Sequence, residues 1–112
     1  MNDSRDTTIL VVTTTVASIA DARQLAQRIL DERLAACVQI DAAVTSHYHW
    51  EGRLCIETEH RLVIKTAPHC AAALQSLFAA EHPYALPQFC AVPAQASQAY
   101  ADWVRAAIDP PA

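Results

Sequence analysis

The stretch from residue 35 to residue 66, "AACVQIDAAVTSHYHWEGRLCIETEHRLVIKT", decides the fold of this 112-residue chain. Residues 37–50 and residues 54–66 each alternate apolar and polar side chains, which is the pattern of an amphipathic strand. Between them lies the single glycine of the chain, Gly52. The stretch therefore predicts two long antiparallel strands joined in a hairpin.

The register of this hairpin can be inferred from the alternation. A two-residue turn at 51–52 would place His49 opposite Leu54, so that polar side chains would face apolar ones along the hairpin. A three-residue connection, 51–53, instead pairs Trp50 with Leu54 and requires the glycine in a left-handed conformation. We therefore expect the three-residue connection, which also pairs Tyr48 with Ile56 and Ala42 with Leu62.

The expected register gathers polar side chains on one face of the hairpin. It places His49 opposite Cys55 and His47 opposite Glu57, with Cβ atoms about 5 Å apart. Imidazole, thiolate and carboxylate groups are all ligands of transition metals. His47, His49 and Cys55 are therefore secondary candidates for a metal site, and the alternative is an ordinary face that contacts solvent or another subunit.

The segments around the hairpin predict the remaining elements. "TTILVVTTT", residues 7–15, is apolar and β-branched without alternation, as in a strand buried on both faces. Ser18 is the expected N-cap of a helix over 18–34, and Thr66 that of a helix that Pro83 ends. The expected apolar faces of these helices are Ile19, Ala22, Leu25, Ala26, Ile29 and Leu30 in the first, and Ala71, Leu74, Leu77 and Phe78 in the second.

A short strand, "LPQFCAVP" at residues 86–93, and a last helix opened by Ser97 complete the chain, with Tyr100, Trp103, Val104 and Ala107 as the helix's apolar face. The order β-α-β-β-α-β-α predicts an α+β, ferredoxin-like antiparallel sheet with helices on one face and an extra C-terminal helix. Because helices on one face cannot cover both sides of the apolar first strand, we expect self-association with closed symmetry.

Length and composition limit the functions that the chain can have. Its 112 residues, 53% of them hydrophobic, predict a single domain over 1–112, with disordered tails at about 1–6 and 109–112. A net charge of −4 argues against nucleic acid as a partner. A single glycine excludes the common nucleotide-binding motifs, so no nucleotide cofactor is predicted. The absence of a leader or an apolar span predicts a cytoplasmic protein that does not bind membranes.

The nucleophilic and basic side chains show no catalytic pattern. Four cysteines lie 15 to 20 residues apart without a C-x-x-C pair, so they are expected to be free thiols. His60 interrupts the apolar face of its strand and is expected to be a hydrogen-bonded core histidine. No nucleophile, base and orienting group can be assembled from the sequence, and we expect a protein that is not an enzyme.

Five segments, "RLAAC", "VTSHYHWEGRL", "LVIKT", "HPYALPQF" and "YADWV", give the chain a clear resemblance to the CutA family of divalent-cation tolerance proteins. The family is similar to PII signal-transduction proteins in fold, with a ferredoxin-like subunit in a tight homotrimer. The resemblance implies a homotrimer that acts in divalent metal ion tolerance, above all towards copper, by binding metal ions. The alternative is a PII-like signalling or interaction scaffold that binds a small ligand or a protein partner at clefts between subunits.

The resemblance also implies a set of metal ligands. In copper-binding members these are a cysteine that ends the first strand and a His-His pair before Pro-Tyr, and the matching positions here are Thr14, Glu81 and His82. Only His82 keeps its family identity, and a threonine cannot supply a thiolate for Cu(I). We therefore expect His82 and Glu81, with Glu59 as a neighbour, to bind copper or another divalent ion.

Overall fold

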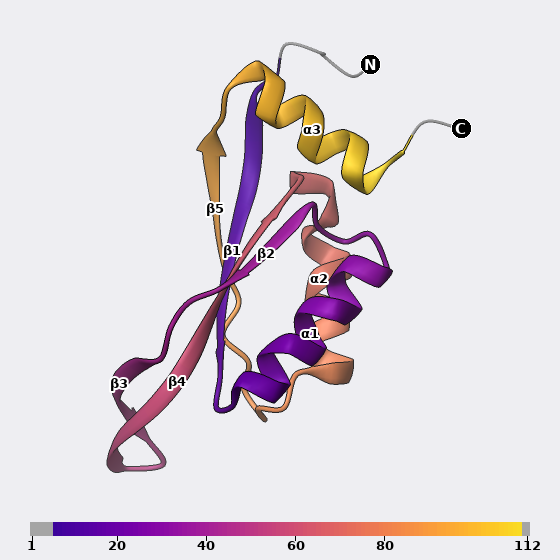
Figure 1. Ribbon diagram of the computed structural model, residues 1–112. Helices are drawn as coiled ribbons and strands as arrows, with labels where there is room; N and C mark the ends of the chain where they lie inside the picture. Colours follow the sequence, from indigo (N-terminus) through magenta and orange to yellow (C-terminus); the bar gives the residue numbers. More distant parts are fainter. Residues whose placement is uncertain (1–5, 111–112) are drawn as a thin grey trace.

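The computed structural model describes residues 6–110 as a five-stranded antiparallel sheet with helices packed against it (Figure 1). The strand order is β2-β4-β1-β5, and β3 pairs with β4 beyond the end of β2. This is the α+β, ferredoxin-like arrangement that the sequence predicts, with its long hairpin and its additional last helix. The elements are β1 (Thr8–Val16), α1 (Ile19–Asp31), β2 (Cys37–Ile40), β3 (Val44–Trp50), β4 (Arg53–Thr66), a 3-10 turn (Pro68–Cys70), α2 (Ala71–Glu81), β5 (Cys90–Gln95) and α3 (Gln98–Ile108).

The main core lies between one face of the sheet and the helices α1 and α2. Alternate residues of the central strands, such as Leu10 and Val12 in β1 and Leu62 and Ile64 in β4, are buried there. Their partners from the two helices are Ala22, Leu25, Ile29, Leu74, Leu77 and Phe78. The expected apolar face of α2 is confirmed, whereas Ile19 and Leu30 at the edges of the α1 face are exposed.

The helix α3 covers part of the opposite side of the first strand. Ile9, which points away from Leu10, is buried in a second cluster with Ala101, Val104 and Ile108, and Val11 packs against this cluster. The expectation that all helices lie on one face is therefore wrong for α3. Its buried face is also turned from the expected one, because Trp103 is exposed.

Capping residues explain where the helices begin. The Ser18 hydroxyl accepts a hydrogen bond from the Asp21 N–H at 3.0 Å, and the Ser97 hydroxyl accepts one from the Tyr100 N–H at 3.2 Å. Both predicted N-caps are confirmed. Thr66 is not a cap: it is the last residue of β4, and its hydroxyl donates to the Leu34 carbonyl at 2.7 Å.

The helix α1 ends three residues before the predicted end. Arg33 adopts φ 54°, and the Leu34 N–H bonds the Ile29 carbonyl at 3.0 Å. A left-handed residue after the C-cap closes a helix in this way, and the position usually holds glycine. Because an arginine occupies it here, the sequence carries no stop signal.

Three positions at the inner ends of the expected tails, 6, 109 and 110, lie within residues 6–110. The Asp6 carboxylate accepts the Thr8 N–H at 2.9 Å, and the Asp109 N–H donates to the Arg105 carbonyl at 2.8 Å. The other tail positions, 1–5 and 111–112, lie outside the described residues.

The register of the hairpin is the main correction to the sequence prediction. Trp50 pairs with Arg53, and His49 pairs with Leu54. Glu51 at φ 51° and Gly52 at φ 76° form a two-residue turn with both residues left-handed, as in a type I′ turn. The left-handed glycine is confirmed, but the three-residue connection is wrong.

An interruption between β2 and β3 causes this change of register. Ile40 pairs with Leu62, whereas Val44 pairs with Glu59, so three residues on one strand, 41–43, face two on the other. One extra residue of this kind is a β-bulge. After it, the side chains of β3 that an uninterrupted strand would point to one face of the sheet point to the other face. The predicted pairing would hold only for an uninterrupted strand from residue 37 to residue 50.

Candidate functional site

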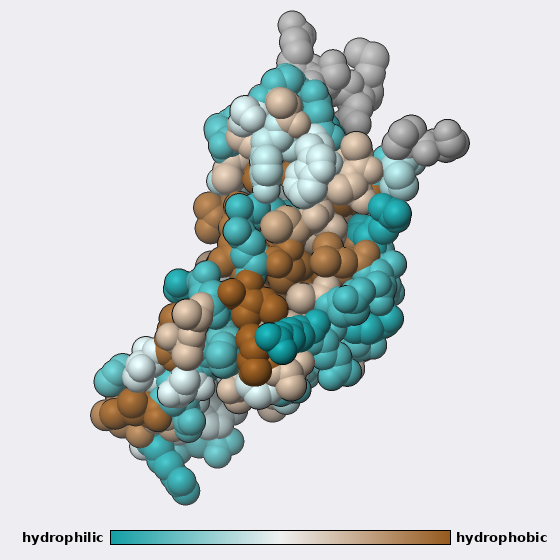
Figure 2. Space-filling view, viewed as in Figure 1, coloured by the Kyte–Doolittle hydropathy of each residue, from teal (hydrophilic) through white to brown (hydrophobic). Residues whose placement is uncertain are grey.

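In the observed register, the three side chains proposed as a secondary metal site do not all lie on the same face of the hairpin. His47 and His49 share one face of the hairpin with Ile56 and Leu54, while Cys55 shares the other face with Tyr48. The two histidines and the cysteine therefore do not converge. The hairpin extends beyond the body of the molecule, and its tip carries hydrophobic surface, with Leu54 65% and Ile56 59% exposed (Figure 2).

The two primary candidates at the end of α2 point in different directions. Glu81, the last residue of α2, forms an ion pair with Arg28 of α1 at 3.0 Å between Oε2 and Nε. The carboxylate of Glu81 is therefore already engaged by a guanidinium group.

His82 is buried, and both of its ring nitrogens have partners. The Tyr84 N–H donates to Nδ1 at 3.1 Å, so Nε2 carries the proton of the neutral ring and donates to the Thr14 hydroxyl at 2.9 Å. Burial lowers the pKa of His82, against smaller opposing effects of the Thr15 backbone and Asp21. The ring is held as a neutral imidazole in one tautomer, and the neutral imidazole is the form that binds metals.

Glu59 is linked to this histidine through Tyr84. The Tyr84 hydroxyl donates to Glu59 Oε2 at 2.6 Å. Burial by itself would raise the pKa of Glu59, but hydrogen bonds from Ser46, Tyr84 and Thr15 outweigh it and lower that pKa. Glu59 is therefore an ionised carboxylate that is only 6% exposed.

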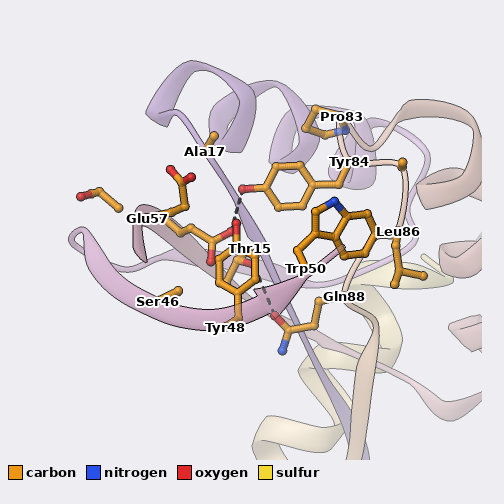
Figure 3. Close-up of a pocket in the computed structure, with 13 residues that line it drawn as sticks. Thr15, Ala17, Ser46, Tyr48, Trp50, Glu57, Pro83, Tyr84, Leu86 and Gln88 are labelled. Atoms are coloured by element: carbon orange, nitrogen blue, oxygen red, sulfur yellow. Dashed lines mark hydrogen bonds between the residues drawn. The ribbon is translucent and has the colours of Figure 1, made fainter. Parts of the chain in front are cut away.

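Glu59 and Tyr84 line a groove between the hairpin and the loop that follows α2, and His82 is not among its lining residues (Figure 3). The groove encloses ≈ 630 Å³. Figure 3 shows Tyr48 and Trp50 reaching into it from β3, opposite Pro83, Tyr84 and Leu86 of the loop. The other lining residues are Thr15, Ala17, Ser46, Glu57, Thr58, Glu59, Ala85 and Gln88.

Tyr48, Trp50, Ser46 and Tyr84 belong to this groove but were not among the predicted site residues. Strand alternation places Tyr48 and Trp50 on the apolar face of the hairpin, but the bulge turns them towards Glu57 and Glu59. The "HPYALPQF" segment contains Tyr84, and a partly buried tyrosine hydroxyl usually has a hydrogen-bond partner. Its partner, Glu59, lies 25 residues away and could not be found by spacing alone.

Comparison with known proteins decides the family. The profile of the family described as CutA1 divalent ion tolerance protein matches residues 10–107. The chain belongs to the CutA1 family. A CutA1 relative in Thermus thermophilus, the divalent-cation tolerance protein CutA, is 41% identical over 96 residues, covering 85% of this chain and 93% of the relative. The protein of the same name in Escherichia coli O45:K1 is 35% identical over 106 residues, covering 94% and 95%.

Solved CutA1-family structures share the fold. CutA from Synechococcus elongatus superposes with a TM-score of 0.86 at 36% identity, covering 92% of each chain. The protein from Archaeoglobus fulgidus, described as a periplasmic divalent cation tolerance protein, gives a TM-score of 0.85 at 30% identity, covering 89% of this chain and 98% of that one. Within residues 6–110 no helix is long and apolar enough to span a bilayer.

The candidate ligands of this CutA1-family chain do not by themselves make a complete metal site. Across the described part of the chain, no three side chains of His, Cys, Asp or Glu converge closely enough to hold an ion. His60 is not the hydrogen-bonded core histidine that its strand position predicts, because its buried Nδ1 finds no partner there.

The buried imidazole predicts a loss of stability in mild acid. In the unfolded chain a histidine binds its proton near pH 6.5, whereas the lowered pKa of His82 keeps the folded imidazole neutral to lower pH. The unfolded state therefore binds more protons in this window, and the stability that is present above about pH 6.5 is lost as the pH falls towards the folded pKa.

Urea unfolding of the metal-free protein at pH 7.5 and pH 5.5 measures this loss. The His82→Gln variant should show a smaller loss between the two pH values than the unmodified protein. His69→Gln is the matched control, since His69 is exposed and bonds Asp109 at the surface. An equal loss in His82→Gln and the unmodified protein would contradict the assignment of the effect to His82.

Proposed function

We propose that this chain acts in divalent-cation tolerance as a homotrimer that binds a divalent cation through Glu59 and His82. Membership of the CutA1 family supports the general role, and its relatives carry that name. The observation that carries the proposal is the charge of Glu59. An ionised carboxylate buried to this extent usually has a cationic partner, and Glu59 has hydroxyl partners but no basic one among residues 6–110.

The donor atoms favour a borderline or hard ion. Carboxylate oxygen from Glu59 and imidazole nitrogen from His82 suit Cu(II) or Zn(II), and the hydroxyl of Thr14 removes the thiolate that Cu(I) prefers. To bind an ion, His82 exchanges its bond to Thr14 or to the Tyr84 backbone for the metal. Glu81 joins the ligand set only if it leaves Arg28, and we propose that the remaining ligands come from a neighbouring subunit.

Apolar surface that the single chain leaves uncovered supports the proposed trimer. Val92 of β5 and Leu54 and Ile56 of the hairpin are more than half exposed. Burying such side chains is favourable, and closed symmetry limits the assembly to a fixed size. Sedimentation equilibrium should give the mass of three chains, and the mass of one chain across the micromolar range would contradict the trimer.

Titration calorimetry of metal-free protein with Cu(II) and with Zn(II) tests the cation site. Glu59→Gln keeps the shape of the side chain but removes its charge, and we expect the affinity to fall by about tenfold or more, as for the loss of one charged ligand. Glu51→Gln, with the same change at the exposed turn, is the matched control and should bind as the unmodified protein does. Equal binding by all three proteins would contradict the proposal.

The groove supports a second function, that of a PII-like module that binds a small ligand. Its volume of ≈ 630 Å³ lies within the range of ligand pockets, and its walls combine aromatic rings with a few polar groups. In this second function the groove binds the ligand and does not catalyse a reaction on it. A ligand that raises the melting temperature of the metal-free protein would support this function, because binding to the folded state alone stabilises it.

We propose the cytoplasm as the compartment. Cys37, Cys55, Cys70 and Cys90 are all free thiols in the structure, and free thiols persist in reducing compartments. Cell fractionation with a compartment marker tests this, and recovery of the protein with periplasmic markers would contradict it.

A further inference from the structure

The walls of the groove carry aromatic and apolar side chains that would not contribute to binding a bare metal ion. Trp50 and Tyr48 line one wall, and Tyr84 and Leu86 line the other (Figure 3). A divalent ion is bound by oxygen and nitrogen atoms and often keeps part of its water, so it gains little from ring faces. The rings point to an occupant with an apolar body.

The charge of the groove has one sign. Among its lining residues are Glu57 and Glu59, and none of the thirteen is lysine, arginine or histidine. Neither carboxylate forms an ion pair within residues 6–110. The groove is therefore negative, with no internal cation to balance it.

One tyrosine of the hairpin wall responds to this negative charge. The pKa of Tyr48 is raised by burial and, to a smaller extent, by Cys55, Glu57 and Glu59. A negative field works against ionisation of a phenol and favours the binding of a cation.

We propose that the groove binds an organic cation, a small alkylammonium compound whose charged head lies between Glu57, Glu59 and the faces of Trp50 and Tyr48. Aromatic faces attract an ammonium group through their quadrupole, and the attraction strengthens when water is excluded. Leu86 and Pro83 on the loop contact the apolar body of the ligand. This inference rests on the second proposed function, the ligand-binding module, and names the ligand class that it takes.

A matched pair of probes separates charge from shape. Choline and 3,3-dimethylbutan-1-ol have nearly the same shape, but only choline carries a positive charge. The chain has two tryptophans, so its ¹⁵N-¹H spectrum contains two indole N–H signals. Trp50 lies in the groove and Trp103 lies on α3 outside it, with 42% and 49% of their surfaces exposed. Trp103 is therefore an internal control of similar exposure.

Choline added to metal-free protein should shift the indole signal of Trp50 and leave that of Trp103 in place. The neutral alcohol should need about tenfold higher concentration for the same shift, as expected for loss of the cation–π and charge attraction. Glu57→Gln should weaken choline binding several-fold, whereas Glu51→Gln, the matched change at the turn, should not. The variants Trp50→Leu and Trp103→Leu assign the two signals.

Three results would overturn the inference. They differ in whether they also contradict the second proposed function, the ligand-binding module. If both probes bind Trp50 equally, the cationic class is wrong but the ligand-binding module stands. If neither probe shifts Trp50 up to the solubility of the alcohol, the inference is wrong and the module loses its support. If choline binds Glu57→Gln as tightly as the unmodified protein, the carboxylates do not recognise the charge.

Discussion

Replacing Ile29 by alanine is expected to lower the free energy of unfolding by about 2–5 kcal/mol. Ile29 is fully buried on α1, within the core that also contains Leu62 and Leu74. The substitution removes three carbon atoms from this core and leaves a cavity that the neighbouring elements can only partly close. Urea unfolding at one fixed protein concentration measures the change.

Leu30→Ala is the matched control for this prediction. Leu30 is the next residue on the same helix, but 40% of its surface is exposed, and alanine is a strong helix former. Its replacement should cost less than about 1 kcal/mol. If Leu30→Ala were as destabilising as Ile29→Ala, the face that α1 presents to the sheet would be wrong.

Replacing Thr14 by valine is expected to lower the free energy of unfolding by about 1–3 kcal/mol, although the two side chains have nearly the same shape. The cost arises because the Thr14 hydroxyl accepts the Nε2–H of His82 at 2.9 Å in the buried core. Valine leaves this N–H without its partner. The free energy of unfolding, measured at pH 7.5 in metal-free protein, tests the expectation.

Thr13→Val makes the same chemical change one residue earlier on β1. Thr13 is only partly buried and faces the opposite side of the sheet, where it pairs with Val63 and Cys90. We expect its replacement to change the stability by no more than about 0.5 kcal/mol. Equal costs at both positions would show that the bond to His82 contributes nothing measurable.

The starts of α1 and α3 and the apolar face of α2 could be predicted from the sequence because their signals are local. Ser18 and Ser97 are caps that act on residues three positions away. The apolar face of α2 repeats at helical spacing and is buried as expected. The unbroken apolar run of β1 is explained by burial on both sides, from α1 and α2 on one side and from α3 on part of the other.

The hairpin could not be predicted in full because its faces are not set by burial within one chain. Tyr48, Trp50, Leu54 and Ile56 are all more than a third exposed, so no core holds the apolar side chains on one side. The bulge at residues 41–43 then determines which side chains of β3 point to each face of the hairpin. Alternation is a dependable guide to register only where one face is buried.

The candidate site was predicted in part. The resemblance to the CutA family brought forward His82, Glu81 and Glu59, and the structure joins His82 to Glu59 through Tyr84 while Glu81 pairs with Arg28. The spacing of residues gave no indication of the Tyr84–Glu59 and Arg28–Glu81 contacts, because each joins segments far apart in the sequence. The groove itself forms because the bulge reverses the faces to which the β3 side chains point. The alternation of apolar and polar residues in the sequence does not reveal this reversal.

We propose that the cation chemistry of this protein lies at Glu59 in the groove and not at the hairpin histidines. Anomalous diffraction from crystals of the protein loaded with Zn²⁺ tests it most directly, because the measurement places the ion without reference to any variant. We expect an anomalous peak about 2.0–2.2 Å from a Glu59 carboxylate oxygen. A peak at His47 or His49, with none at Glu59, would contradict the claim.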